Sequence, residues 1–366
     1  MEKINVALLF GGRSGEHEVS LNSAFSIANG FNNDNYNVIP VGIAKNGIWY
    51  GPVDIKDIKE FKPDMYKGAE VTILPQQNSK LYSLSQNQEI LTLDVIFPII
   101  HGTFGEDGTL QGLLEMSGIP YVGSGVLGSA VGMDKVVMKQ IFAYHNLPQV
   151  NFTYIYRHEY EKDPQAVKRK IISKLKFPMF IKPANLGSSV GISKVKSENQ
   201  LFDALSAASK YDSKIIIEEG MDVREIEVSV LGNENPQASI PGEIIPSNEF
   251  YDYKAKYIDN QSTLEIPANL DMDTTNLIRK IAIDAYLAAE CSGLARVDFF
   301  LCKNTGEILI NEINTLPGFT TISMYPKLWE YSGLEMQQLL DKLIQLAFEK
   351  HKEKNKNLTT FSVETA

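Results

Sequence analysis

The sequence has little cysteine and shows no metal-binding pattern built from cysteine or histidine. Its two cysteines, Cys291 and Cys302, lie in apolar segments with helical and strand patterns. Such surroundings favour reduced thiols in a protein core and a reducing compartment. The five histidines show no HxxxH spacing, and there is no CxxC pair. A zinc site is therefore not expected.

Long hydrophobic runs and an excess of positive charge are also missing. No apolar run approaches the roughly 20 residues that span a bilayer. The N-terminal run at residues 4–10 breaks into Gly-Gly-Arg without a cleavage-site pattern, so we expect no signal peptide, no membrane association and a cytoplasmic location. The formal net charge of −10 argues against a nucleic-acid partner, because phosphate backbones recruit basic surfaces.

What is present indicates a folded protein of two or three domains. The chain has 366 residues, of which 43% are hydrophobic and 22% charged. Over residues 1–122, short β-rich runs alternate with helical patterns, which predicts a doubly wound α/β domain. Glycine-rich loops at 11–16 and 101–108 follow two of its predicted strands. Residues 52–92 are polar, and we interpret them as an irregular peripheral excursion.

The pattern changes after residue 122. Residues 179–182 and 191–195 are predicted to be short strands joined by a loop of small residues. Further strands are expected at 214–219 and 225–231, followed by a polar loop at 250–259. A long helix through residue 289, a hairpin at 295–314 and a C-terminal helix complete the prediction.

Two short motifs match familiar signatures without their structural context. The GxGxxG pattern at 123–128 lacks the acidic residue expected about 20 positions later. The GxSxG pattern at 187–191 precedes a β-pattern rather than the helix that follows a nucleophilic serine. No GxxxxGK[ST] occurs, so any ATP must bind without a Walker loop.

The hairpin at 295–314 carries the clearest chemistry. Strand alternation places Arg296 and Asp298 on one face, and Glu312 and Asn314 share a face of the return strand. A symmetric hairpin places Asp298 opposite either residue 311 or residue 312. Only the register with residue 312 brings the polar pair of one strand next to the polar pair of the other.

Oxygen ligands of this kind suit Mg²⁺, which takes one or two carboxylates together with substrate phosphates. The alternative is an exposed polar face with an ordinary salt bridge. Charges crowded beside a core favour a counter-ion, and the flanking apolar residues indicate such a core on the other face of the hairpin. These residues are Val297, Phe299, Phe300, Leu309, Ile310 and Ile313.

Residues 295–298 and 311–320 resemble the metal segment of ATP-grasp ligases, and specifically of the D-alanine:D-alanine ligase family. The resemblance covers nearly the whole chain in ordered blocks at 10–20, 101–112, 133–135, 181–183, 187–191 and 250–257. It implies an N-terminal preATP-grasp domain (1–122) followed by an ATP-grasp fold of two α+β subdomains (123–212 and 213–366). It also implies a homodimer.

The implied reaction joins two D-alanines with ATP as co-substrate, through an acylphosphate, for peptidoglycan precursor synthesis. Two Mg²⁺ ions are implied, and Mn²⁺ is expected to substitute. Alternatives are a D-alanine:D-lactate ligase and a nucleotide-binding regulator without catalysis. A regulator would lack Asp298, Glu312 or Lys182, and all three are present.

The resemblance also assigns site residues. Metal binding falls to Asp298, Glu312 and Asn314. ATP binding falls to Lys135, Lys182, Ser189, Glu218, Glu219, Met221, Glu225 and Lys256. Catalysis and D-alanine binding fall to Glu16, His101, Ser188, Tyr257, Arg296, Gly318 and Ser323.

Each of the substrate residues has an implied role. Glu16 binds the ammonium of the first D-alanine, and His101 lies near its carboxyl group. Arg296 and the Gly318 amide form an oxyanion hole. Ser323 accepts the carboxylate of the second D-alanine.

The polar loop at 250–259 is implied to close over the site. Ser188 and Tyr257 hydrogen-bond with Glu16 when it closes, and tyrosine at 257 favours an amine nucleophile. Taken singly, several of these residues have simpler readings: Glu16 as a helix N-terminal acid, the lysines as surface residues and Tyr257 as a packing aromatic.

Overall fold

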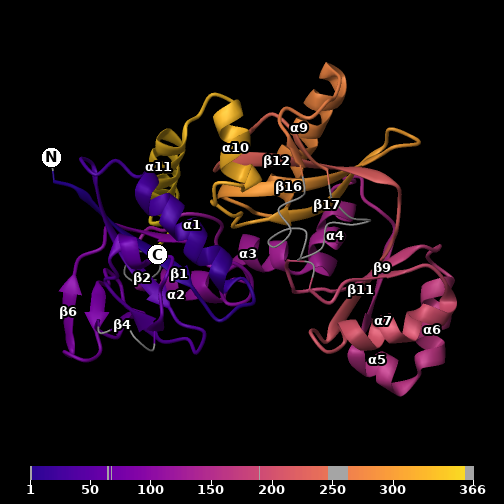
Figure 1. The fold of residues 1–366 in the computed structure, drawn as a ribbon, viewed down its shortest axis with the longest axis horizontal. Coiled ribbons are helices and arrows are strands. Elements are labelled where there is room, and N and C mark those ends of the chain that lie inside the picture. Colours follow the sequence, from indigo (N-terminus) through magenta and orange to yellow (C-terminus); the bar gives the residue numbers. More distant parts are fainter. Residues whose placement is uncertain (1, 64–65, 67, 189, 246–262, 359–366) are drawn as a thin grey trace, which may run out of the picture.

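The computed structural model describes residues 2–63, 66, 68–188, 190–245 and 263–358, and within them the strands form four sheets (Figure 1). Ser189, Lys256 and Tyr257 lie outside the described residues, so their roles stay predictions. No helix in the described part of the chain is both long and apolar enough to cross a membrane.

The N-terminal sheet confirms the α/β prediction. In spatial order its strands are β3 (Trp49–Tyr50), β2 (Tyr36–Ile43), β1 (Ile4–Gly11) and β7 (Val95–Pro98). The central β1 runs parallel to β2 and β7, and alternate β1 residues enter opposite cores. Helix α1 (His17–Gly30) contributes to one core and α2 (Thr109–Ser117) to the other. The sheet is therefore covered on both faces, as parallel sheets are.

The prediction that residues 52–92 are irregular is wrong in part. After η1 (Ile55–Asp57), the strands β4 (Val71–Ile73), β5 (Leu81–Ser83) and β6 (Gln88–Leu91) form a small antiparallel sheet. Val71, Ile73 and Leu81 are buried in the core that contains α2. Strands of three or four residues show too little alternation to stand out from a polar loop.

The central sheet is antiparallel. Its order is β10 (Ser193–Val195), β9 (Met179–Pro183), β11 (Lys214–Glu219) and β8 (Phe152–Tyr156), which confirms the pair of short strands around the small-residue loop. Helices α6 (Pro164–Ile172) and α7 (Leu201–Ala208) pack in one core with this sheet. The short elements α5 (Arg157–Lys162) and η3 (Glu198–Gln200) precede α6 and α7 in the chain.

The C-terminal sheet carries the hairpin. Its order is β15 (Thr263–Glu265), β14 (Gly242–Ile245), β12 (Val223–Gly232), β16 (Gly293–Cys302) and β17 (Ile308–Asn314), and β13 (Gln237–Ala238) also pairs with β12. Helix α9 (Met272–Ala288) packs on one face of this sheet, and α10 (Met324–Tyr331) follows the hairpin.

Core membership does not follow chain order. Helix α3 (Val126–Met133) and helix α4 (Lys135–Tyr144) place Val131 and Met138 in the core of the C-terminal sheet. The last helix, α11 (Met336–Lys354), packs with α1 and β1 in the N-terminal core and lies beside α1 in Figure 1. The two ends of the chain are thereby tied together, and the boundaries at 122 and 212 stay predictions.

Candidate functional site

The β16–β17 hairpin brings the predicted metal ligands together. Asp298 pairs with Glu312, and Arg296 pairs with Asn314. One step further along, Phe299 pairs with Ile310, so that one residue of β17 is left over as a β-bulge. The bulge selects the second of the two registers that the sequence allowed, in which the polar pairs meet.

The bulge also corrects one prediction about the apolar flanks. Val297, Phe299, Ile310 and Ile313 lie in the core beneath α9, as expected. Phe300 and Leu309 do not, because they pack instead with Val150, Val223 and Cys302 in a separate cluster. The shift of register carries Leu309 to the same side as Phe300, so the prediction that both face the main core is wrong.

Ion pairs hold the polar face of the hairpin. Arg296 binds both carboxylate oxygens of Asp298, Nε to Oδ1 at 2.7 Å and Nη2 to Oδ2 at 2.7 Å, and its Nε lies 2.9 Å from Oε2 of Glu227. Burial lowers the pKa of Arg296, but Asp298 and Glu227 outweigh burial and raise it well above its ordinary value. The guanidinium is therefore a permanent positive charge in the site.

Among the described residues, no group of three or more His, Cys, Asp or Glu side chains could hold a metal by itself. The predicted set, Asp298, Glu312 and Asn314, consists of two carboxylates and an amide. Such a set fits Mg²⁺ only if substrate phosphates complete the coordination shell, as is usual for this ion. Lys135 stands at the same place, with its Nζ 3.3 Å from Oε2 of Glu312 and bonded to the Leu186 carbonyl at 3.1 Å.

A buried triad lies behind the predicted phosphate site. Glu218 joins two lysines, with Oε2 2.5 Å from Nζ of Lys182 and Oε1 2.9 Å from Nζ of Lys139. Burial raises the pKa of Glu218, but the two ammonium groups outweigh burial and lower it to about 2. Burial lowers the pKa of Lys182 and the carboxylate more than restores it, whereas for Lys139 burial prevails and its pKa is lowered.

Glu16 lies between two loops that come close together. A Cβ added to Gly102 would stand 2.7 Å from Oε2 of Glu16, and one added to Gly187 would stand 3.1 Å from it. The hydroxyl of Ser188 donates a hydrogen bond to Oε1, and Ser188 itself has a positive φ of 51°. The predicted Glu16–Ser188 hydrogen bond is thus present, and both glycines are needed for the close approach.

His101 and Glu106 are buried titratable groups of the loop at 101–108. Burial lowers the pKa of His101, and its Nδ1 lies 3.0 Å from the carbonyl oxygen of Leu316. Burial and the neighbouring Glu16 raise the pKa of Glu106 to about 8, while its Oε2 accepts a hydrogen bond of 2.5 Å from the Gly102 amide.

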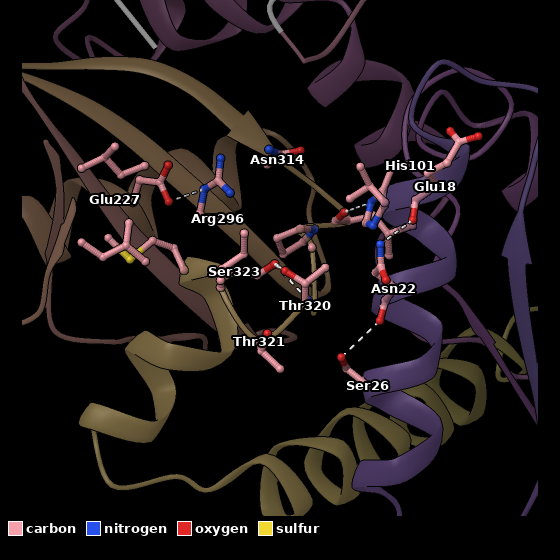
Figure 2. A pocket seen from close by; sticks show the side chains of 18 of the residues that line it. Glu18, Asn22, Ser26, His101, Glu227, Arg296, Asn314, Thr320, Thr321 and Ser323 are labelled. Carbon is pink, nitrogen blue, oxygen red and sulfur yellow. Dashed lines mark hydrogen bonds and ion pairs between the residues drawn. The ribbon is translucent and has the colours of Figure 1, made fainter. Parts of the chain in front are cut away.

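A cavity of about 510 Å³ opens between α1 and the hairpin (Figure 2). His101 lies on the α1 side, Arg296 and Asn314 lie on the sheet, and Ser323 lies between them. Ser323 precedes the first residue of α10, and its Oγ accepts a hydrogen bond of 3.0 Å from the Thr320 amide. Helix N-termini favour anions, so the cavity offers a place for a carboxylate.

The predicted adenine contacts surround the end of β11. Glu219 turns its carboxylate to Asn151 Nδ2 at 2.9 Å and to the Lys176 amide at 2.8 Å, so it is already engaged. Met221 is 42% exposed and its sulfur lies 3.9 Å from that of Cys302. Glu225 is half-buried on β12.

Sequence reasoning missed Lys139, Glu106 and Glu227. Glu227 pairs with Asp298 across β12 and β16 and lines the cavity. Glu225, Glu227 and Ser229 lie two positions apart and so share one face of β12. This polar alternation is a signal in the sequence that could have identified Glu227. For Lys139 and Glu106 burial is the decisive property, and nothing in their sequence surroundings shows it.

Comparison with known proteins gives consistent matches. The family model described as D-ala D-ala ligase N-terminus matches residues 5–124, and the model described as D-ala D-ala ligase C-terminus matches residues 141–345. A D-alanine--D-alanine ligase of Natranaerobius thermophilus is 51% identical over 99% of this chain and 100% of its own. A D-alanine--D-alanine ligase of Thermoanaerobacter pseudethanolicus is 52% identical over 97% of this chain and 99% of its own.

Solved structures agree with these matches. The D-alanine-D-alanine ligase from Coxiella burnetii superposes with a TM-score of 0.84 at 37% identity, over 97% of each chain. A D-Ala:D-Ser ligase from Enterococcus faecalis superposes with a TM-score of 0.86 at 35% identity, over 94% of this chain and 100% of its own.

Proposed function

This chain belongs to the D-alanine–D-alanine ligase family, and from that premise we propose how its own residues carry out the reaction. The protein is an ATP-dependent ligase that joins two D-alanines for peptidoglycan precursor synthesis. One observation supports the residue roles above all others. His101, Arg296 and the stretch that contains Asn314, Gly318 and Ser323 come from three parts of the chain and line a single cavity.

The nucleotide lies between the central and C-terminal sheets in this proposal. Asp298, Glu312 and Asn314 would hold two Mg²⁺ ions, or Mn²⁺ in their place, and bound ions neutralise the charge of the transferring phosphoryl group. Lys135 and Lys182 contact the phosphates as point charges. The remaining nucleotide contacts are assigned to Ser189, Glu218, Glu219, Met221, Glu225 and Lys256.

The first half of the reaction activates a carboxylate. Glu16, oriented by the Ser188 hydroxyl, binds the ammonium group of the first D-alanine and so places its carboxylate near His101. A carboxylate oxygen attacks the γ-phosphorus, the bond to the β-phosphate oxygen breaks, and an acylphosphate and ADP result. Activation is needed because a free carboxylate is a poor acyl donor.

The second half forms the peptide bond. The amine of the second D-alanine attacks the acyl carbon, and the developing oxyanion receives hydrogen bonds from Arg296 and from the Gly318 amide. The bond from the acyl carbon to the phosphate oxygen then breaks, and the departing phosphate takes up the proton that the amine loses. Ser323 and the N-terminus of α10 bind the carboxylate of the second D-alanine. Tyr257 closes the loop over the site and keeps water from the acylphosphate.

A homodimer and a cytoplasmic location belong to the proposal. The homodimer rests on the family resemblance, and the location rests on the two cysteines, whose apolar surroundings favour a reducing compartment. Light scattering of the purified protein tests the first: a mass of twice 40.8 kDa supports a dimer, and a mass of 40.8 kDa refutes it.

The reaction itself is tested by mixing the protein with ATP, Mg²⁺ and D-alanine, and by measuring phosphate release together with the mass of the product. Equal amounts of phosphate and dipeptide support the proposal. Turnover only after D-lactate is added would identify a depsipeptide ligase, and turnover only with D-serine would match the Enterococcus relative. No turnover with any acceptor would indicate a regulator.

A further inference from the structure

The hydroxyl of Ser23 connects two distant segments of the site. Ser23 is completely buried on α1, and its Oγ lies 3.2 Å from Nε2 of His101 and 3.2 Å from the Phe319 amide nitrogen. Its neighbours Asn22 and Ser26 donate instead to carbonyl oxygens one turn back in their own helix, as polar side chains in helices commonly do. Ser23 is therefore set apart by its contacts with other segments.

Hydrogen-bond chemistry fixes the direction of each bond. The Leu316 carbonyl can only accept, so Nδ1 of His101 carries the proton. Burial lowers the pKa of His101, and Nε2 of the neutral ring is then an acceptor. Ser23 donates its hydroxyl proton to Nε2 and accepts the proton of the Phe319 amide. Every donor and acceptor in this chain of bonds is satisfied.

The two ends of the chain of bonds enclose the Gly318 amide. His101 holds the Leu316 carbonyl on one side, and Ser23 holds the Phe319 amide on the other. Gly318 itself lies close to both serines: an added Cβ would stand 2.8 Å from Oγ of Ser323 and, at ordinary contact distance, 3.9 Å from Oγ of Ser23. A peptide held at both neighbouring positions keeps its N–H pointing in one direction.

We propose that Ser23 is a positioning residue: it keeps the unprotonated Nε2 of His101 hydrogen-bonded and fixes the Gly318 amide where the oxyanion forms. The part concerning the oxyanion rests on the proposed ligase function. Charged groups that act on His101 are Glu16, which precedes α1, and Arg296 on β16, and the buried Glu106 lies beside Glu16.

Ser23→Ala is the first test. A displaced oxyanion donor costs less than a deleted one, for which about 10²–10³-fold is typical, so we expect kcat to fall about tenfold. The KM for ATP should stay unchanged. Loss of the bond to Nε2 removes support for the neutral ring, so the pKa of His101 rises and the acid limb of the kcat profile moves to higher pH.

Two further variants make the result specific. Ser117→Ala also deletes the hydroxyl of a completely buried serine, but that hydroxyl donates to Leu114 within α2, so kcat and its pH profile should stay at wild-type values. Ser23→Cys keeps nearly the same size with a weaker hydrogen-bonding group and should give an intermediate loss. Ser23→Cys also replaces Ser23→Ala as the test variant if Ser23→Ala does not fold.

A titration without substrates separates this inference from the ligase proposal. In protein labelled with ¹⁵N-histidine, the His101 signal is identified by its loss in His101→Gln. A shifted Nε2 resonance and a raised pKa in Ser23→Ala support the inference. An unchanged titration, or a folded Ser23→Ala with wild-type kcat and pH profile, overturns it. Absence of ligase activity in the wild-type protein would instead refute the proposed function.

Discussion

Replacement of Glu218 by glutamine should destabilise the protein far more than removal of one of its lysine partners. In the triad the side chain of Glu218 is 3% exposed, that of Lys139 is 1% exposed and that of Lys182 is 11% exposed. Glutamine preserves the shape but leaves two ammonium groups facing each other without a counter-charge. Breaking a buried ion pair in this way costs about 3–5 kcal/mol.

The matched control is Lys139→Met. It keeps the pair between Glu218 and Lys182 at 2.5 Å and leaves that part of the site neutral. Because burial lowers the pKa of Lys139, folding already disfavours its charged form. Replacement by an apolar side chain of similar length should therefore cost less than about 1.5 kcal/mol.

Thermal unfolding of the ligand-free variants measures the difference. At about 2–4 °C per kcal/mol, Glu218→Gln should lower the melting temperature by about 6–20 °C and Lys139→Met by a few degrees. Melting of Glu218→Gln close to the wild-type temperature would refute the reasoning. An equally large drop for Lys139→Met would refute it as well, since the lysine would then matter as much as the carboxylate.

The same triad predicts a pH dependence. The two lysines lower the pKa of Glu218 to about 2 from its ordinary value of 4.5, so folding favours the charged carboxylate. Its contribution to stability is complete above about pH 4.5 and is lost as the pH falls toward about 2. Between these values the wild-type protein should lose more stability than Glu218→Gln, as parallel melting curves would show.

Three further predictions concern activity. Glu312→Gln should abolish phosphate release while the circular dichroism spectrum stays native, as a metal-bridging role requires; unchanged turnover would refute the metal assignment. Gly318→Ala should lower kcat by at least about tenfold, because its Cβ would stand 2.8 Å from Oγ of Ser323 and displace the oxyanion donor; a wild-type kcat would place that donor elsewhere. Tyr257→Phe should raise depsipeptide over dipeptide when D-lactate and D-alanine compete, and an unaltered product ratio by mass spectrometry would count against the loop argument.

Local patterns were enough to predict most of the elements around the site. Alternation placed Arg296 and Asp298 on one face of β16 and Glu312 and Asn314 on one face of β17. In the structure the two faces meet, with Arg296 opposite Asn314 and Asp298 opposite Glu312. Alternation works here because the period of a strand is two and one face of the hairpin is buried. The order of strands and helices likewise predicted the N-terminal α/β sheet, in which β1, β2 and β7 are parallel and only the short β3 is antiparallel.

Contacts between residues far apart in the sequence were not predicted by these local patterns. Ser23 meets residues 78 and 296 positions away, and α11 packs in the core of β1 at the opposite end of the chain. Lys139 looks like any lysine on a helix, and only the tertiary fold buries it against Glu218. Contacts of this kind depend on how elements are placed in space, and neither periodicity nor propensity contains that information.

The bulge in β17 shows how one extra residue can make one part of a sheet face polar and the next part apolar. On one side of it, Asp298 and Glu312 meet as carboxylates suited to a metal ion. On the other side, the register shift brings Leu309 beside Phe300 and Cys302, and Met221 reaches this cluster through its sulfur. Under the proposed function, an apolar cluster beside this polar face would suit a nucleotide, whose base is flat and weakly polar and whose phosphates are charged. Without the bulge Leu309 would face the core beneath α9, and the cluster of Phe300 and Cys302 would lose it.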